Sequence, residues 1–264
     1  MSAAGAQTPD MGACWRLVYR LPWLLVHLFI GLPLTLLSFA PPLRVIKIGP
    51  LGLNEIMQGW WAARLCRIFG LRSRLKGDFV RGPALVAANH IAWLDIQLLH
   101  GFAAMGFVAK AEIERWPVAG WVAGFGETVF HRRGSHDSSS NVLTEMKQRL
   151  EAGRKVAIFP EGGILPGEGI KRFHARMFAA AIEAGVPVQP VMLRYLRGGR
   201  LYPEITFLPG ENFMANLLRL LCQPACTAEV RVLEPIDPRG KKRDELARMA
   251  QQAVTAAYDS GLPA

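Results

Sequence analysis

Cysteine is scarce in this sequence. The 264 residues include four cysteines, none of which forms a C-x-x-C pair, and no histidine lies at metal-ligand spacing from Cys222 and Cys226. We therefore expect no metal site. Isolated thiols of this kind are typical of buried side chains in a reducing compartment.

Several other signatures are missing as well. The glycine-rich stretch at residues 162–169 lacks the Lys-Ser/Thr pair of a phosphate-binding P-loop. No internal repeat or low-complexity run is visible, and no basic stretch is interleaved with aromatic residues as in known nucleic-acid-binding modules. We therefore expect no nucleic-acid partner.

Acidic residues are outnumbered by basic ones. The chain has 21 Asp and Glu against 31 Lys and Arg, which gives a formal net charge of +10. Hydrophobic residues make up 51% of the chain, a high share for a soluble protein, and they concentrate near the N-terminus. This composition suits an anionic membrane surface, where each cation contributes about 1 kcal/mol.

The longest uncharged stretch runs from Leu21 to Ala40. A helix of this length rises about 30 Å, the thickness of a bilayer core. Pro22 and Pro33 leave two conformations open, a spanning helix and a kinked or re-entrant hairpin. Residues 38–40 also resemble a signal-peptide cleavage site, but the length and the double proline that follows disfavour that alternative.

The next segment, residues 54–69, has the pattern of an amphipathic helix with tryptophan on its apolar side. Two placements stay open for it, packing on the core or lying among lipid headgroups. We accordingly divide the chain into a disordered N-terminus (1–15), a membrane-associated helical segment (16–72) and one folded domain (73–264).

Short apolar strands and helices alternate beyond residue 77. We expect strands at residues 84–90, 105–111, 127–132, 155–160, 186–193, 205–210 and 228–236. We expect helices at residues 94–102, 141–152, 175–184 and 244–258. The almost wholly apolar run at 155–160 is typical of the buried centre of a sheet. The alternation predicts an α/β fold, with a mixed, largely parallel sheet flanked by helices.

The sequence NHIAWLD contains the residues with the clearest chemical pattern, Asn89, His90 and Asp95. The histidine follows a strand, at the edge where open α/β sheets bind ligands. Within one helix His90 and Asp95 would lie about 140° apart, whereas a strand-to-helix turn can pair them. A paired carboxylate fixes the imidazole tautomer, so that the other ring nitrogen can take a proton from an alcohol. The alternative is that Asp95 only caps the helix.

This NHxxxxD turn resembles the signature of the glycerolipid acyltransferase family, which includes the lysophosphatidic acid acyltransferases. Three further blocks of the family have counterparts in order. ETVFHRR (127–133) is similar to G-x-x-F-x-x-R, FPEGG (159–163) to F-P-E-G-T, and VPVQPV (186–191) to V-P-x-x-P-V. The resemblance covers roughly residues 75–195, and it makes the folded domain an acyltransferase catalytic domain.

The resemblance implies that His90 and Asp95 are the catalytic pair. His90 would be the general base and Asp95 the residue that orients it, with the acceptor hydroxyl attacking an acyl thioester directly. No cofactor is expected, because acyl-CoA or acyl-carrier protein enters as the donor substrate.

The same resemblance implies substrate-binding roles for Arg133, Glu161 and Gly162. An arginine can bind a phosphate bidentately, and glycine allows close approach of the backbone to a ligand. Lys110 and Arg132 are further candidates for a phosphate contact, although either could be only a surface charge.

The implied function is a membrane-bound O-acyltransferase that acylates a lysophospholipid, with 1-acylglycerol-3-phosphate as the leading acceptor. Glu127 stands where the family has glycine, and Gly163 where it has threonine. Both departures lie near the expected headgroup site, so another acceptor such as lyso-ornithine lipid stays open. The non-enzyme alternative is a membrane-peripheral lipid-binding protein. Because both donors are cytosolic, we expect the cell inner membrane, with the active site facing the cytoplasm.

Overall fold

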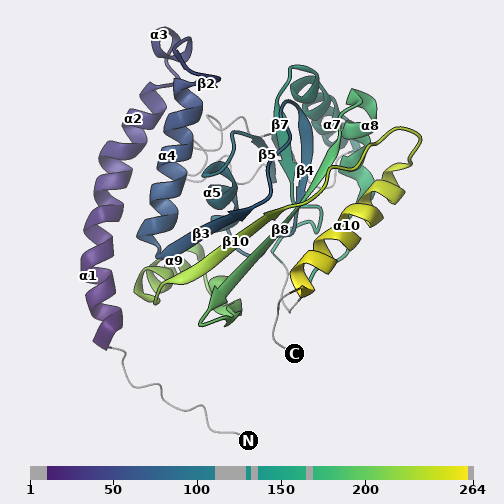
Figure 1. Cartoon of the computed structure of the whole chain (residues 1–264). Coiled ribbons are helices and arrows are strands. Elements are labelled where there is room, and N and C mark those ends of the chain that lie inside the picture. Colours follow the sequence, from purple (N-terminus) through teal and green to yellow (C-terminus); the bar gives the residue numbers. More distant parts are fainter. Residues whose placement is uncertain (1–10, 111–128, 132–135, 165–168, 261–264) are drawn as a thin grey trace, which may run out of the picture.

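The computed structural model describes residues 11–110, 129–131, 136–164 and 169–260. An N-terminal helical arm lies along one side of an α/β domain (Figure 1). The arm is built from helices α1 (Met11–Val26), α2 (Leu32–Leu37), α3 (Pro41–Arg44) and α4 (Leu53–Ile68), and from the small hairpin of β1 (Lys47–Ile48) and β2 (Leu51–Gly52). α1 begins inside the stretch 1–15, for which the sequence predicted disorder.

The chain stays helical through both prolines of its apolar stretch. A π-helical turn at His27–Gly31 joins α1 to α2, just before Pro33, which lacks the N–H that a regular helix would use. The helical stretch Gly12–Leu37 is long and apolar enough to cross a membrane. Its exposed side chains include Trp15, Tyr19, Trp23, Phe29 and Ile30.

α4 lies between α2 and α5 and returns along the arm (Figure 1). Trp61, Leu65 and Cys66 are buried, whereas Trp60 is half-exposed. The side of the helix that carries these buried residues packs on the core, which is the first of the two placements left open by the sequence.

The central sheet has eight strands within the described residues. They are β3 (Leu71–Lys76), β4 (Ala84–Ala88), β5 (Gly106–Lys110), β6 (Val129–His131), β7 (Lys155–Ile158), β8 (Val188–Arg197), β9 (Arg200–Leu201) and β10 (Cys226–Val232). Their order is β3-β10-β8-β4-β7-β5-β6, with β9 paired to β8. Only the pairs of β8 with β10 and with β9 are antiparallel among these strands. The predicted mixed, largely parallel sheet is confirmed.

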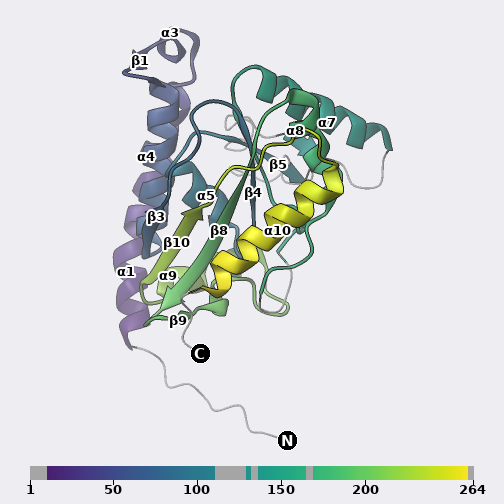
Figure 2. The same cartoon turned by 45° about the vertical axis from the view of Figure 1, so that its right-hand side comes forward.

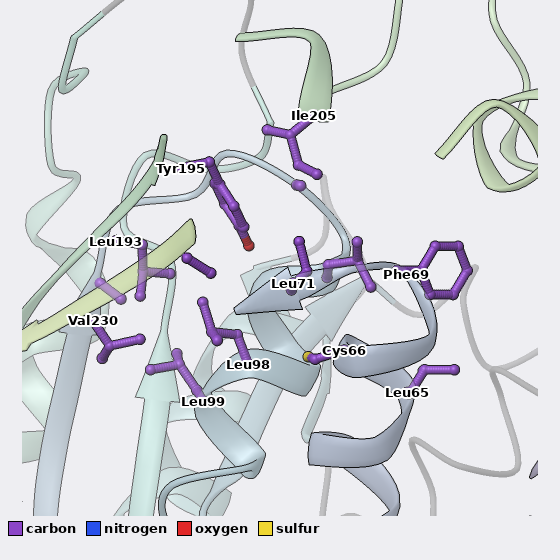
Figure 3. Packing of buried hydrophobic residues seen from close by; sticks show 14 of the residues in the cluster. Leu65, Cys66, Phe69, Leu71, Leu98, Leu99, Leu193, Tyr195, Ile205 and Val230 are labelled. Carbon is purple, nitrogen blue, oxygen red and sulfur yellow. The ribbon is translucent and has the colours of Figure 1, made fainter. Parts of the chain in front are cut away.

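Helices cover both faces of this sheet and create two hydrophobic cores (Figure 2). One core lies under α4, α5 (Leu94–His100) and α9 (Phe213–Cys222), and Figure 3 shows its packing around Leu71, Leu98 and Leu193. The other lies under α7 (His136–Glu151), the 3-10 turn Ala175–Phe178, α8 (Ala179–Ala184) and α10 (Arg243–Asp259). β4 is wholly buried because its residues alternate between the two cores.

One predicted strand is absent from the structure, and two longer elements of the structure were not predicted. The predicted strand at 205–210 is wrong, since a 3-10 turn at Pro203–Ile205 leads into a loop whose Thr206 carbonyl accepts hydrogen bonds from side chains of α9. β3 and α9 were not predicted. β3 pairs with β10 over six residues, and this edge pairing tolerates its exposed cations. β3 also straddles the boundary that the sequence suggested at residue 72.

Candidate active site

The turn between β4 and α5 is anchored by Asn89. Its side-chain amide donates to the carbonyl of Leu193 (2.9 Å), and its side-chain oxygen accepts from the amide of Leu193 (2.7 Å). Asn89 is almost fully buried. These two bonds continue the pairing of β4 with β8 after the strand has ended, and so they fix the point from which His90 projects.

Asp95 lies in the first turn of α5 and is completely buried. Its Oδ2 accepts hydrogen bonds from His90 Nδ1 (2.9 Å) and from the amides of Ile91 (2.6 Å) and Ala92 (2.9 Å). Its Oδ1 accepts from the hydroxyl of Tyr195 (2.6 Å). Four donors thus compensate the burial of one carboxylate. The capping role considered from the sequence is present, but together with the pairing to His90.

The imidazole of His90 is held in one orientation. A carboxylate can only accept, so Nδ1 carries the proton in the bond to Asp95, and Nε2 presents a lone pair. The ring stacks on Phe159 with centroids 3.9 Å apart and planes 12° from parallel. Within the described part of the chain, no group hydrogen-bonds Nε2. The side chain is 13% exposed, so Nε2 remains accessible to a substrate.

Glu161 connects the histidine turn to a second loop. Its Oε2 accepts from the amide of His90 (2.8 Å) and its Oε1 from the amide of Lys171 (2.8 Å). Burial raises the pKa of this carboxyl, and the two backbone amides oppose that shift. Glu161 therefore holds the backbone at His90 and at Lys171 in fixed positions. The substrate contact suggested for it stays a prediction.

Two glycines follow Glu161 in conformations with positive φ, +84° at Gly162 and +150° at Gly163. These values are unfavourable for residues with a Cβ, and for a β-branched residue most of all. Gly163, which stands where the family motif has threonine, therefore adopts a backbone conformation that glycine favours and threonine does not. Substrate binding by Gly162 stays a prediction.

A cavity of about 160 Å³ opens beside His90. Its lining includes Glu161, Lys171, Tyr195 and Tyr202. The ring of Tyr202 packs under the guanidinium of Arg197, 3.5 Å from the ring centroid. His90 thus shares the cavity with four polar residues that come from four separate segments of the chain.

Of the remaining predicted residues, Arg132 and Arg133 lie outside the described residues. Lys110 is the last residue of β5. β4, β7 and β5 are parallel neighbours, so Lys110 ends its strand at the same edge of the sheet as His90. The described residues contain no group of three or more His, Cys, Asp or Glu side chains that could hold a metal ion.

Tyr195, Lys171 and Tyr202 were not singled out from the sequence. Tyr195 lies 100 residues beyond Asp95, and only the pairing of β8 with β4 brings the two together. Lys171 lies within the range of the family resemblance but outside its four motif blocks. No local pattern marks Tyr202, because its position depends on the turn after β9.

Known proteins are similar to this chain in sequence and in fold. Residues 71–194 match the model of the Acyltransferase family. The chain is 42% identical over 205 residues to a lyso-ornithine lipid O-acyltransferase of Pseudomonas aeruginosa, an alignment that covers 78% of this chain and 79% of that one. This chain belongs to the lysolipid acyltransferase family. The recognition based on four motif blocks is confirmed.

Further known proteins are similar to this chain in sequence or in fold. A lyso-ornithine lipid O-acyltransferase of Brucella abortus is 31% identical over 255 residues, covering 91% of this chain and 94% of its own length. A 1-acyl-sn-glycerol-3-phosphate acyltransferase of Neisseria gonorrhoeae is 40% identical over 111 residues, 42% of this chain and 44% of that one. The crystal structure of the 1-acyl-sn-glycerophosphate acyltransferase of Thermotoga maritima shares the fold, with a TM-score of 0.70 at 21% identity over 95% and 96% of the two chains.

Proposed function

We propose that this protein transfers a fatty acyl group from acyl-CoA or acyl-carrier protein to the free hydroxyl of a lysolipid, with His90 as the general base. The observation that carries the proposal is the bond from His90 Nδ1 to the buried Asp95, which leaves Nε2 available as a base on a residue that lines the cavity. A lipid-binding protein without turnover would have no need of such an oriented base.

The reaction needs one proton to move twice. Nε2 of His90 takes the proton of the acceptor hydroxyl while the hydroxyl oxygen bonds to the carbonyl carbon of the thioester. The tetrahedral intermediate then collapses, the carbon–sulfur bond breaks, and the departing thiolate takes the proton from the imidazolium. The carboxylate of Asp95 stabilises the imidazolium between the two transfers.

Lyso-ornithine lipid is the acceptor that we favour. Two of the relatives named for this acceptor align over 79% and 94% of their lengths, whereas the Neisseria gonorrhoeae relative aligns over 44% of its own. 1-Acylglycerol-3-phosphate, which the motif resemblance suggested first, is the second candidate and rests on that Neisseria relative. An ornithine headgroup carries a carboxylate and an ammonium group, so it needs different partners from a phosphate.

We place the enzyme at the cytoplasmic face of the inner membrane. Its donors are cytosolic, its acceptor lies in the bilayer, and the helical stretch Gly12–Leu37 is apolar enough to enter it. The net charge of +10 favours an anionic leaflet.

His90→Ala and Asp95→Asn test the chemistry. Removing a general base costs about 10²–10⁴-fold in rate, so we expect purified His90→Ala to lose acyl transfer by such a factor while its thermal unfolding changes little. Asp95→Asn should also lower transfer, and its thermal unfolding should fall because the buried carboxylate accepts four hydrogen bonds. His174→Ala removes an exposed histidine and serves as the matched control, with transfer at the wild-type rate. Undiminished transfer by His90→Ala would refute the mechanism.

A competition between acceptors tests the substrate. Lyso-ornithine lipid and 1-acylglycerol-3-phosphate are presented in identical vesicles, and kcat/KM is measured for each with acyl-CoA and with acyl-carrier protein. We expect the larger kcat/KM with lyso-ornithine lipid. A larger value with 1-acylglycerol-3-phosphate would make the second candidate the substrate and leave the mechanism intact.

A further inference from the structure

Helix α9 exposes apolar residues and buries a polar one, although Leu220 and Leu221 also pack into the core. Its exposed side chains are all apolar, namely Met214 (58% exposed), Ala215 and Leu218 (41% exposed). Asn216, between them in sequence, is completely buried. A surface helix in water normally turns its polar residues outward.

Hydrogen bonds hold the polar side chains of α9 against the protein. The Asn216 side chain accepts from Trp93 Nε1 (2.9 Å) and donates to the Thr206 carbonyl (3.1 Å) and to Glu211 Oε2 (2.8 Å). Arg219, the other polar residue of the helix, donates to Glu211 through Nε (2.7 Å) and Nη2 (2.9 Å). With these groups satisfied internally, the outer surface of α9 does not need water.

We propose that the outer surface of α9, formed by Met214 and Leu218, is a second membrane contact of this protein, located on the catalytic domain itself. Leu208, in the loop before the helix, is 42% exposed and adds to the apolar side chains of this segment. The proposal rests on the membrane placement proposed above and adds a contact from the α/β domain to that of the N-terminal arm.

The position of α9 makes its surface continuous with the arm. α9 lies beside the N-terminal end of α1 in both views (Figures 1 and 2). Arg16 Nε donates to the Cys222 carbonyl (2.5 Å), and Arg20 Nη1 donates to the carbonyls of Leu221 (3.0 Å) and Gln223 (2.7 Å). α1 thereby caps the C-terminal end of α9, so an arm embedded in lipid brings α9 to the bilayer.

The length of α9 determines how it can meet a bilayer. Ten residues, Phe213–Cys222, form a helix about 15 Å long, half of what a bilayer core requires. α9 is therefore expected to lie in the interface with its apolar side down, as amphipathic helices do.

α9 also connects the proposed lipid contact to the active site. Trp93, in the turn between His90 and Asp95, bonds to Asn216 and packs edge-on against Phe213 with centroids 5.2 Å apart. The segment leading to α9 lines the cavity through Tyr202, Pro203 and Thr206. A bilayer under α9 would therefore place this rim of the cavity next to the headgroups from which a lysolipid enters.

A fluorescent probe tests the contact directly. Met214→Cys and, as matched control, Ile182→Cys are labelled with an environment-sensitive fluorophore in a full-length Cys14→Ser, Cys222→Ser background. Ile182 is 37% exposed and lies on α8, under the opposite face of the sheet. In phosphatidylcholine–phosphatidylglycerol vesicles containing nitroxide-labelled lipid, we expect strong quenching at position 214 and none at 182.

The possible outcomes separate this inference from the membrane placement. A chain that does not bind vesicles contradicts the membrane placement and the inference together. A chain that binds but shows no more quenching at 214 than at 182 contradicts the contact by α9 alone. A fluorescence change at 214 that depends on protein concentration and needs no vesicles would show a protein partner and would also overturn the inference.

A second pair of variants tests the consequence for activity. Leu218→Glu places a charge on the outer surface of α9, and Ile182→Glu places one on α8. We expect Leu218→Glu to lower transfer to acceptor embedded in vesicles about tenfold, because it removes a lipid-buried leucine, and Ile182→Glu to leave it unchanged. With acceptor in detergent micelles both variants should match wild type. Equal rates of Leu218→Glu and wild type on vesicles would overturn the role of α9 in substrate access.

Discussion

Tyr195 completes the surroundings of Asp95. Its hydroxyl points into the core beneath α5 (Figure 3) and donates to the oxygen of Asp95 that His90 does not use, at 2.6 Å. Burial first, and then the neighbouring carboxylate, raise the pKa of Tyr195 well above the ordinary value, so the phenol stays protonated and keeps donating. Tyr195 is therefore a positioning residue that acts on His90 through Asp95.

Tyr195→Phe should lower kcat about tenfold, because a hydrogen bond to a charged group contributes ~1.5–3 kcal/mol. The KM for the lysolipid should change little, since the ring remains in place. Steady-state kinetics on vesicles measures both constants. In an Asp95→Asn background the same substitution should have almost no further effect on kcat, and full additivity of the two substitutions would contradict the positioning role.

His100 makes stability depend on pH at the other end of α5. Burial lowers its pKa to about 4, although the bond from its Nε2 to the Met105 carbonyl (3.0 Å) opposes the shift. The unfolded chain takes up this proton near pH 6.5 and the folded chain only near pH 4. The stability contributed by neutral His100 is therefore present above pH 6.5 and is lost as the pH falls toward 4.

Between pH 7 and pH 5, His100 should account for a loss of about 2 kcal/mol in the free energy of unfolding. Urea unfolding at the two pH values measures the loss, and His100→Gln should show a smaller pH dependence by that amount. The same pH dependence in both proteins would show that His100 does not stay neutral in the fold.

At the scale of elements, the docking of α1 against α9 depends on Arg20. The side chain is almost fully buried, and its guanidinium bonds to two carbonyls at the end of α9. Carbonyls at the C-terminal end of a helix have no partner within the helix, so removing the arginine leaves these two acceptors unpaired. The N-terminal arm is thus attached by specific polar contacts as well as by apolar packing.

We expect Arg20→Ala to lower the free energy of unfolding by about 2–3 kcal/mol, as for a hydrogen-bonded charged group removed from a buried site. Urea unfolding in detergent, followed by tryptophan fluorescence, measures the change. Arg44→Ala, at an exposed position of α3, is the control and should change the free energy by less than about 0.5 kcal/mol. Equal effects of the two substitutions would mean that Arg20 does not hold α1 in place.

Some helices and strands could be predicted from sequence patterns, and others could not. β4, β7 and α10 were predicted because their apolar residues recur with the period of buried strands or of a helix. α9 was missed because its ten residues are fewer than the window of about 11–18 residues over which a helical period can be recognised. β3 was missed because an edge strand is defined by its pairing with β10, which residues far along the chain provide.

At the scale of the whole molecule, apolar side chains and net charge can both attach the protein to a membrane, but the two contributions depend differently on salt. The arm exposes large side chains such as Trp15 (72%) and Phe29 (75%), which gain from burial in lipid at any ionic strength. The charge of +10 acts only within a Debye length, ~3 Å at 1 M salt.

We therefore expect the full chain to float with neutral phosphatidylcholine vesicles even in about 1 M NaCl. Added anionic lipid should raise the bound fraction at low salt and have little effect at high salt. Flotation through a density gradient measures both. Complete release from vesicles by salt would show that attachment is electrostatic and that the arm does not enter the bilayer.

The sequence by itself determined the family and predicted the pairing of His90 with Asp95, which the structure confirms as a hydrogen bond. Both depend on local order, since a turn that follows a strand brings residues 90 and 95 together wherever the rest of the chain lies. Only the tertiary structure decided what surrounds that pair. Tyr195, Glu161 and Phe159 reach it from β8 and from the loop after β7, and sheet pairing alone sets those distances. The sequence likewise did not determine which side of α9 faces outward. The hydrogen bonds of Asn216 with Trp93 and Glu211 turn the side of the helix that carries Asn216 toward the protein.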